Sequence, residues 1–433
     1  MFIGRKDEKK QLENAFGGEH NNLLVLYGRE GIGKTSFLFN FCEDKRYFYY
    51  NAIEITPAMQ EKRFAKIEKE ISEYAVSGKV VLIIDEFRYF SDEMLNEKII
   101  GLLDNENLKI MIILVSSSVN WVENSMVNEA RSIARRLTGI MKLKDLSFRE
   151  AVEWYPKISV EDCVLMRSVM GGIPKYLRLW ADNRRTRENI ISLLLTKGSV
   201  LENEAEFFLK LELRELAAYN AILIALAGGK YKLNDIYAET GFSRAKISVY
   251  LKNLIEMDIV EKVNMAYVRH YDKTQKGLYR IRDSFIRFYY AYVYPNRDLI
   301  EQGRGRQVYD EKILPDMPRF VRESFAEVAK EFLMILSRRG SLKAGYNDFR
   351  TWIGKTGTID IVANDGEGST LAAVCFYEER QADAEEIAAV KEMLSSAGLR
   401  CKEIFIFARA GFTDRARAMA QSEEIMTVAM SDL

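Results

Sequence analysis

A glycine-rich loop between an apolar strand and a helix constrains this chain more than any other feature. Residues 28–35 read GREGIGKT and fit the pattern GxxxxGK[ST] in full, directly after the apolar run LLVLY and before the helical stretch SFLFNFCE. In that context the backbone N–H groups, the following helix dipole and the lysine converge on phosphate oxygens. The loop therefore predicts a nucleotide site, and the alternative is a strand-to-helix turn that binds nothing. The residues predicted to contact the nucleotide here are Gly28, Gly31, Ile32, Gly33, Lys34, Thr35 and Ser36.

Two acidic residues follow a second apolar strand, as nucleotide hydrolysis requires. The run VVLII at 80–84 ends in Asp85 and Glu86. We expect Asp85 and the Thr35 hydroxyl to hold Mg²⁺. Lys34 would contact the β and γ phosphates, and Glu86 would polarise the attacking water. The alternative for this pair is a strand that simply ends in solvated carboxylates.

A third apolar strand, at 109–115, ends in a run of serines at 116–118. A polar group at that point could sense the γ phosphate, and the alternative is a serine-rich turn. Downstream, Arg135 and Arg136 are candidates to stabilise transition-state charge, with Arg136 acting in cis or from a neighbouring copy of the chain. Paired arginines on a solvated surface are the alternative.

Composition excludes several other classes of protein. The 433 residues carry 63 Lys plus Arg against 63 Asp plus Glu, so the net charge is zero and a polyanion-coating protein is disfavoured. Two histidines and four widely spaced cysteines argue against a His/Cys zinc site and against His-dependent catalysis. No apolar run reaches the ~20 residues that span a bilayer, and the charged start MFIGRKDEKK lacks a signal-peptide core. We therefore expect a reduced, cytoplasmic protein that does not cross a membrane.

The motifs taken together resemble one family over essentially the whole chain. In order they are FIGR, LYGREGIGKTS, LIIDEF, LVSSSV, RRLTG, LSFREA, MGGIPKYL and YPNRDLIEQGRG. This series resembles the archaeal-type ATPases of the STAND branch of AAA-like P-loop proteins. The resemblance implies ATP or ADP as the nucleotide, with Ile3 packed on the adenine side and Pro174 touching the base. One departure is Val115-Ser116, where relatives tend to carry threonine and glycine.

Residues 214–290 predict a winged helix-turn-helix. A short helix at 233–240 is followed by a Gly-Phe turn, and Ser243 can cap a longer helix through Met257. Arg244, Ser248 and Lys252 share an exposed stripe of that helix. Between 262 and 287, seven Lys or Arg stand against two Asp or Glu, around a hairpin expected at Lys276-Gly277. Such a module can bind double-stranded DNA, and the alternative, from the resemblance, is a lid or a protein-partner surface.

The last stretch resembles a restriction-endonuclease-like domain, with the order strand, strand, helix, strand, helix, strand. A working nuclease of this type needs an Asp on one strand and Glu-x-Lys on the next. Asp360 fits the first position, but Val374 and Phe376 stand where the Glu and Lys belong. We therefore expect a vestigial, inactive nuclease domain that serves for binding.

The predicted architecture is thus an α/β multidomain chain. Its expected parts are a P-loop NTPase domain with a parallel sheet at 1–144, a helical lid bundle at 145–213, a winged helix-turn-helix at 214–295, a helical connector at 296–344 and a restriction-endonuclease-like domain at 345–433. The leading hypothesis is an ATP-binding, slowly hydrolysing switch that controls a partner and can form a nucleotide-dependent homo-oligomer. The alternatives are a DNA-binding regulator controlled by ATP and, ranked last, an ATP-gated Mg²⁺-dependent nuclease.

Overall fold

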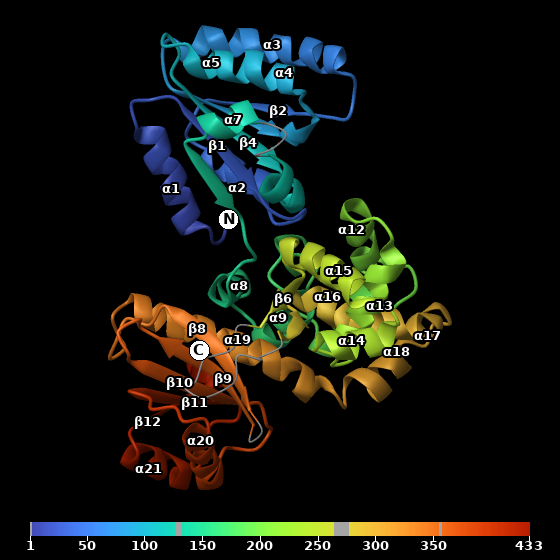
Figure 1. Ribbon diagram of the computed structural model, residues 1–433, viewed down its shortest axis with the longest axis vertical. Helices are drawn as coiled ribbons and strands as arrows, with labels where there is room; N and C mark the ends of the chain where they lie inside the picture. Colours follow the sequence, from blue (N-terminus) through green and yellow to red (C-terminus); the bar gives the residue numbers. More distant parts are fainter. Residues whose placement is uncertain (1, 127–130, 264–276, 355–356) are drawn as a thin grey trace. The chain divides into compact units, whose positions relative to one another are not determined.

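The computed structural model describes residues 2–126, 131–263, 277–354 and 357–433. The chain divides into two compact units (Figure 1). Unit 1 contains residues 1–146 together with 173–178, and unit 2 contains residues 147–172 together with 179–433. A short segment from the middle of the helical region therefore belongs to the N-terminal unit.

Unit 1 is built on a five-stranded sheet in which every neighbouring pair of strands is parallel. Its strands are β1 (Asn22–Tyr27), β2 (Tyr47–Asn51), β3 (Val80–Asp85), β4 (Ile110–Ser116) and β5 (Gly139–Lys142), in the spatial order β2-β3-β4-β1-β5. Strands β3 and β4 are buried along their whole length, as expected of near-continuous apolar runs covered on both faces. Because all strands run the same way, their carboxyl ends meet at one edge of the sheet.

Helices cover both faces of this sheet (Figure 1). The helices of unit 1 are α1 (Lys6–Gly17), α2 (Lys34–Phe41), α3 (Pro57–Ala75), α4 (Asp92–Met94), α5 (Gly101–Asp104), α7 (Arg131–Arg136) and α10 (Pro174–Leu177), with short turns η1 (Phe87–Tyr89), η2 (Leu95–Ile100) and η3 (Trp121–Ser125). Phe64 and Ile71 of α3 pack with alternate residues of the central strands, such as Leu82 and Ile112. This core joins α3 to the central strands of the sheet.

Unit 2 begins with helices whose starts are marked by capping serines. Ser147 forms a capping box with Glu150, and Ser159 and Ser243 cap the helices that follow them. The helices up to the C-terminal sheet are α8 (Phe148–Trp154), α9 (Val160–Met170), α11 (Thr186–Leu194), α12 (Glu204–Glu212), α13 (Leu216–Ala227), α14 (Leu233–Thr240), α15 (Arg244–Glu256), α16 (Ser284–Phe288), α17 (Arg297–Glu301), α18 (Gly305–Val308) and α19 (Met317–Arg338), with turns η4 (Tyr289–Val293), η5 (Tyr294–Asn296) and η6 (Tyr309–Ile313).

The winged helix-turn-helix is confirmed. Helices α13, α14 and α15 are followed by an antiparallel pair, β6 (Val260–Lys262) and β7 (Tyr279–Ile281). Gly241 ends α14 at φ 69°, a left-handed conformation that makes the turn into α15. The hairpin tip expected at Lys276-Gly277 lies largely outside the described residues, because 264–276 are not described.

The chain ends in a mixed sheet with two helices on one face. Its elements are β8 (Asp348–Gly354), β9 (Gly357–Asn364), β10 (Thr370–Phe376), β11 (Glu403–Ala408), β12 (Ile425–Ala429), α20 (Ala384–Ser396), α21 (Asp414–Ser422) and the turn η7 (Met430–Asp432). The order is β12-β11-β10-β9-β8, antiparallel from β8 to β10 and parallel from β10 to β12. Apolar residues of α20 and α21 pack on one face, and α19 packs on the sheet through ring contacts such as Phe332 with Phe407.

Candidate nucleotide-binding site

The glycine-rich loop lies at the carboxyl edge of the unit 1 sheet, between β1 and α2. The Gly28 N–H donates to the carbonyl of Ser116 at 3.3 Å, which ties the loop to the end of β4. A Cβ on Gly28 would lie 2.6 Å from the Leu143 carbonyl oxygen, so no other residue fits there. Gly33 has φ 89° and caps α2, a left-handed conformation that favours glycine. The loop is therefore held against the sheet by its glycines.

Lys34 is buried within this loop. Its Nζ donates to the carbonyls of Gly28 at 2.8 Å and Arg29 at 3.2 Å. A buried ammonium at a helix N-terminus gives the loop a positive field, which favours an anion such as a phosphate.

Thr35 and Asp85 lie side by side although fifty residues separate them. The Thr35 hydroxyl donates to Asp85 Oδ2 at 2.9 Å, and the Tyr49 hydroxyl of β2 donates to the same oxygen at 2.9 Å. Hydroxyl and carboxylate oxygens are the ligands that Mg²⁺ prefers, so this pair fits a magnesium ion. Burial, and then the charge of Asp85, raises the pKa of Tyr49, so its hydroxyl stays protonated as a donor.

Tyr49 was not singled out from the sequence. The run YFYYN at 47–51 was not recognised as a strand, because it forms a half-exposed edge of the sheet. Its pairing with β3 places Asn51 beside Asp85 and Tyr49 beside Ile83, and thereby brings the phenol within reach of the carboxylate.

Glu86 follows β3 in a left-handed conformation, with φ 51°. Its Oε1 accepts from the Ser117 N–H at 3.1 Å, and its Oε2 lies 3.3 Å from Arg88 Nε. The end of β4 therefore touches both the loop, through Ser116, and the acidic pair, through Ser117. The Ser116 hydroxyl itself accepts from the Ser118 N–H at 3.2 Å.

Arg136 does not join this cluster. Its guanidinium pairs with Asp104 at the end of α5, just before the segment that leads into the amino end of β4. Two residues further on, the Thr138 N–H donates to Leu23 near the start of β1. Arg136 thus lies at the amino edge of the sheet, opposite the glycine-rich loop, and the expectation that it acts in cis is wrong for this conformation.

Two segments distant in sequence close around the loop. Near the N-terminus, the Phe2 ring lies 6.1 Å from that of Phe37 in α2, and Arg5 Nη2 donates to the Ile32 carbonyl at 3.4 Å. Ile3, between them, is half-buried. At Pro174, the first residue of α10, a Cβ built on Gly33 would lie 3.7 Å from the proline ring.

The backbone next to Pro174 bonds directly to the loop. The Lys175 N–H donates to the Gly31 carbonyl at 3.1 Å, and the Lys175 ammonium lies 3.6 Å from Glu30. Ile3 and Pro174 were assigned to the nucleotide only through the family resemblance. Both lie within unit 1 with the loop.

The predicted DNA-contact residues lie on the exposed face of α15. The Arg244 Nε donates to Asn234 at 2.9 Å, and its guanidinium lies 4.4 Å from the Tyr237 ring centre. The Ser248 hydroxyl donates to the Arg244 carbonyl, and Lys252 pairs with Glu256 at 3.5 Å.

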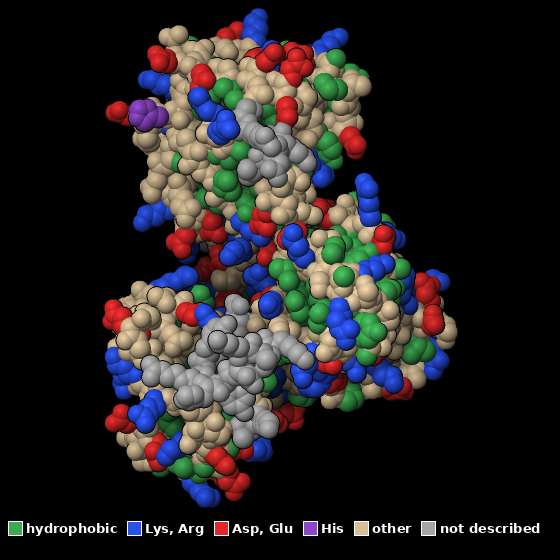
Figure 2. All heavy atoms as spheres, viewed as in Figure 1, with side chains coloured by type: hydrophobic (Ala, Val, Ile, Leu, Met, Phe, Trp, Pro, Cys, Tyr) green, Lys and Arg blue, Asp and Glu red, His purple; other side chains and the backbone are tan. Residues whose placement is uncertain are grey.

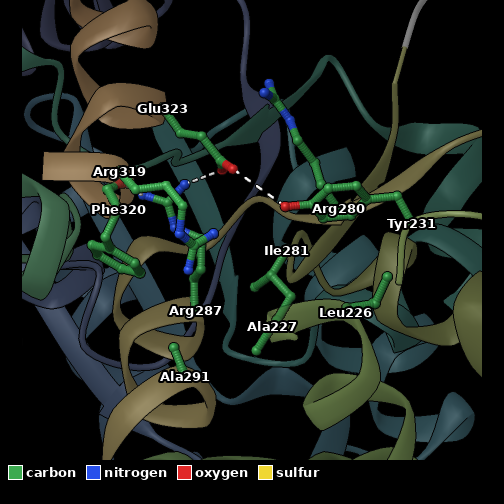
Figure 3. A pocket seen from close by; sticks show the side chains of 10 residues that line it. All are labelled: Leu226, Ala227, Tyr231, Arg280, Ile281, Arg287, Ala291, Arg319, Phe320 and Glu323. Atoms are coloured by element: carbon green, nitrogen blue, oxygen red, sulfur yellow. Dashed lines mark hydrogen bonds and ion pairs between the residues drawn. The ribbon is translucent and has the colours of Figure 1, made fainter. Parts of the chain in front are cut away.

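The described arginines from β7 to the end of α16 each pair with an acid of unit 2, and the basic residues expected at 269, 273 and 276 lie outside the described residues. Arg280 pairs with Glu261 and Glu327, Arg282 with Asp258, and Arg287 with Glu323. Figure 3 shows Glu323 between the Arg287 guanidinium and the Tyr231 hydroxyl, in a small pocket beside α19. Two of these pairs, Arg280 with Glu327 and Arg287 with Glu323, connect the winged helix to α19. On the face in Figure 2, acidic and basic side chains are likewise interspersed.

Asp360 contacts an arginine and a backbone N–H. Its carboxylate accepts from Arg322 of α19 and from the Cys375 N–H, while Val374 belongs to the core beneath α20. Across the described residues, no group of three or more His, Cys, Asp or Glu could hold a metal ion. The carboxylate of Glu379, three residues after the end of β10, lies 3.8 Å from the Arg409 guanidinium.

The fold and the glycine-rich loop define a P-loop protein with an AAA domain and a winged helix. Residues 20–152 match the AAA domain family, residues 220–262 match the arsR family of bacterial regulatory proteins, and residues 289–387 match DUF234, described as archaeal and bacterial proteins of unknown function. No helix in the described ranges combines the length and hydropathy needed to cross a membrane.

A relative over most of the chain is the uncharacterized protein MJECL04 of Methanocaldococcus jannaschii, 30% identical over an alignment of 393 residues that covers 86% of this chain and 86% of that one. The uncharacterized ATP-binding protein MJ0423 of the same organism is 41% identical over 46 residues, 11% of this chain and 78% of that protein. The chain belongs to the family of archaeal-type ATPases that join an AAA domain, a winged helix and a DUF234 region.

Among solved structures, the Walker-type ATPase PABY2304 of Pyrococcus abyssi is 17% identical, covering 67% of this chain and 96% of that one, with a TM-score of 0.48. The ORC2 protein of Aeropyrum pernix is 14% identical, covering 69% of this chain and 94% of that one, with a TM-score of 0.42.

Proposed function

We propose that this protein is an ATP-binding, slowly hydrolysing molecular switch of the STAND type. The observation that carries the proposal is the attachment of residues 173–178 to the nucleotide unit, through the hydrogen bond from Lys175 to Gly31. The residues on either side, Gly172 and Leu179, belong to unit 2. A conformational change at the glycine-rich loop would therefore move residues 173–178, which are covalently continuous with α9. We expect the backbone to bend at Gly171, which has φ 68°, and at Gly172.

The chemistry follows from the residues at the sheet edge. Lys34 and the loop amides would bind the phosphates, with Ile3 and Pro174 at the base. Thr35 and Asp85 would hold Mg²⁺, which neutralises phosphate charge when bound. Glu86 would orient the attacking water and accept its proton.

Slow hydrolysis is consistent with what surrounds Glu86 and with the position of Arg136. Both carboxylate oxygens of Glu86 already contact a partner, and no role in cis remains for Arg136 in this conformation. Arg136 could still supply charge from a second copy of the chain, which would make turnover depend on a nucleotide-bound homo-oligomer.

The test is binding and hydrolysis of ATP by the full-length protein and two variants. Lys34→Ala should lose nucleotide binding, while Glu86→Gln should keep binding and lose turnover by about 10²–10⁴-fold, the usual size of general-base catalysis. Lys66→Ala, an exposed lysine on α3, is the matched control and should behave as wild type. A rate of ATP hydrolysis that is unchanged in both Lys34→Ala and Glu86→Gln would contradict the proposal.

The switch itself needs a second measurement. Hydrogen exchange across α9 should differ between the ADP-bound protein and the protein with a non-hydrolysable ATP analogue. Identical hydrogen exchange in the two nucleotide states would contradict the switch, although the protein could still be an ATPase.

A second candidate function is that of a DNA-associated regulator. It is favoured by the match of residues 220–262 to a regulatory helix-turn-helix family and by the exposed stripe of α15, on which Arg244, Ser248 and Lys252 lie. A nuclease is disfavoured, because Asp360 pairs with an arginine and no group of three or more His, Cys, Asp or Glu among the described residues could hold a metal ion.

A further inference from the structure

Arg88 lies beside Glu86, the residue proposed to activate water. It sits in the turn η1, two residues after Glu86, and its Nε lies 3.3 Å from Glu86 Oε2. Both side chains are partly shielded, with 33% of Arg88 and 22% of Glu86 exposed, so solvent weakens this ion pair less than it would on an open surface.

The turn that carries Arg88 is rigidly anchored. Phe87 is fully buried and packs against Trp121, with ring centres 5.2 Å apart, and the Tyr89 N–H closes the turn onto the Glu86 carbonyl at 3.1 Å. The guanidinium also stacks over the Tyr89 ring at 4.9 Å and donates to its hydroxyl at 3.1 Å. Arg88 is thus held in place from two sides.

The Glu86 carboxylate is oriented from two sides as well. Its Oε1 accepts from the Ser117 N–H, and its Oε2, which makes no hydrogen bond to any described residue, faces Arg88. The left-handed backbone at Glu86 directs the side chain towards β4. A carboxylate held in this way must turn before it can take a proton from a water at the γ phosphate.

We propose that Arg88 is a positioning residue that restrains Glu86 in a resting orientation, so that breaking the Arg88–Glu86 ion pair is a step in activating hydrolysis. This inference rests on the proposed function. Arg88 would lower the rate of ATP turnover and would take no part in binding the nucleotide.

The experiment is steady-state ATP hydrolysis by full-length wild type, Arg88→Ala, Arg88→Gln and Arg88→Lys. Removing the cation should raise kcat by about two- to fivefold at nearly unchanged KM, the size expected when a partly exposed ion pair no longer opposes the rotation. Arg88→Lys keeps the charge and should stay close to wild type. Arg46→Ala is the matched control, because Arg46 also stacks on a tyrosine, Tyr74, but lies beside the amino end of β3.

Ionic strength gives a readout that a merely structural role would not move. Raising the salt from about 0.05 M to about 0.5 M should screen the pair and raise the kcat of wild type more than that of Arg88→Ala. A kcat that stays the same or falls in both Arg88→Ala and Arg88→Gln would contradict the inference that Arg88 slows turnover.

The same assays separate this inference from the function beneath it. If hydrolysis does not depend on Lys34 and Glu86, both the proposed function and the inference about Arg88 are wrong. If hydrolysis depends on both residues but Arg88→Ala and Arg88→Gln are no faster than wild type, only the inference about Arg88 is wrong.

Discussion

The Asp360 carboxylate in β9 accepts a hydrogen bond from the Arg322 guanidinium in α19 at 3.1 Å. The β8–β9 register shifts at this point, since Trp352 faces Ile359 whereas Arg350 faces Val362, so β9 carries an extra residue around Asp360. Such a bulge re-aims a side chain. The second Asp360 bond, from the Cys375 N–H at 2.9 Å, continues the contact with β10 past the last ladder pair. An arginine thus pairs with the one carboxylate that the sequence placed at a nuclease position.

Breaking this pair should destabilise the protein more than neutralising it. Arg322→Ala leaves a buried carboxylate with only the Cys375 N–H, and we expect it to lower the free energy of unfolding by about 1–3 kcal/mol. Asp360→Asn can still accept both hydrogen bonds and should cost less than about 1 kcal/mol. Urea unfolding measures both variants. Equal losses would mean that the contact of α19 with the sheet does not depend on this charge.

The stability difference between wild type and Asp360→Asn should depend on pH. Burial raises the pKa of Asp360 above its ordinary value, although Arg322 and the Cys375 N–H act in the opposite direction. A raised acid pKa means that the folded protein disfavours the ionised form, so wild type loses stability as the pH rises from the unfolded pKa through the folded pKa. Asparagine cannot ionise. The unfolding free energy of wild type relative to Asp360→Asn should therefore fall with rising pH, and a rise would contradict the direction of the shift.

Tyr49→Phe should raise the Mg²⁺ concentration needed for nucleotide binding or turnover. The phenol holds Asp85 Oδ2 together with Thr35, and losing such a supporting bond weakens a metal site by about tenfold or more. Titrating Mg²⁺ at fixed ATP measures the effect. Tyr47→Phe, on the same strand but exposed, is the control and should leave the titration unchanged. An unchanged Mg²⁺ requirement in Tyr49→Phe would show that Asp85 needs no support from β2.

Pro174→Ala should weaken nucleotide binding by a few fold, because the ring packs at the loop where the base is expected. Lys175→Ala removes a partly exposed ion pair with Glu30, worth under about 1 kcal/mol, but keeps the backbone bond to Gly31, and should change affinity less than Pro174→Ala. Fluorescence titration with a labelled nucleotide compares the two. If Lys175→Ala weakened nucleotide binding more than Pro174→Ala, the prediction that the base lies against Pro174 would be wrong.

Local patterns predicted the elements that bury the most apolar surface. The central strands β1, β3 and β4, the helices of the winged helix and the order of elements from β9 to β12 were all visible in the sequence. The edge strands β2, β5 and β8 were missed, whereas the edge strand β12 was predicted: β5 has four residues, and β8 is buried only at Trp352. An edge strand buries little, so its alternation of apolar residues is weak.

Contacts across elements account for the remaining differences. The glycine-rich loop, Asp85 and Glu86 follow from motifs, but Tyr49, Arg88 and Arg322 act through partners that only strand pairing and helix packing bring near. Arg136 is the opposite case. Its position in the chain suggested an arginine that acts in cis or from a neighbouring copy, and the parallel topology, which puts the end of α7 at the amino edge of the sheet, argues against the first of these roles.

Binding of duplex DNA, the second candidate function, should depend on two cations of α15. Lys252 is 73% exposed and can reach a phosphate, so Lys252→Ala should lower affinity uniformly and reduce the slope of log K against log salt by about one. Arg244→Ala should lower affinity as well. Lys246→Ala is the matched control, because this lysine points towards Glu215 and Tyr250 and should leave binding unchanged. Fluorescence anisotropy over a salt series measures all three. Salt-insensitive binding, or equal losses in all three variants, would assign α15 to a protein partner instead of a DNA groove.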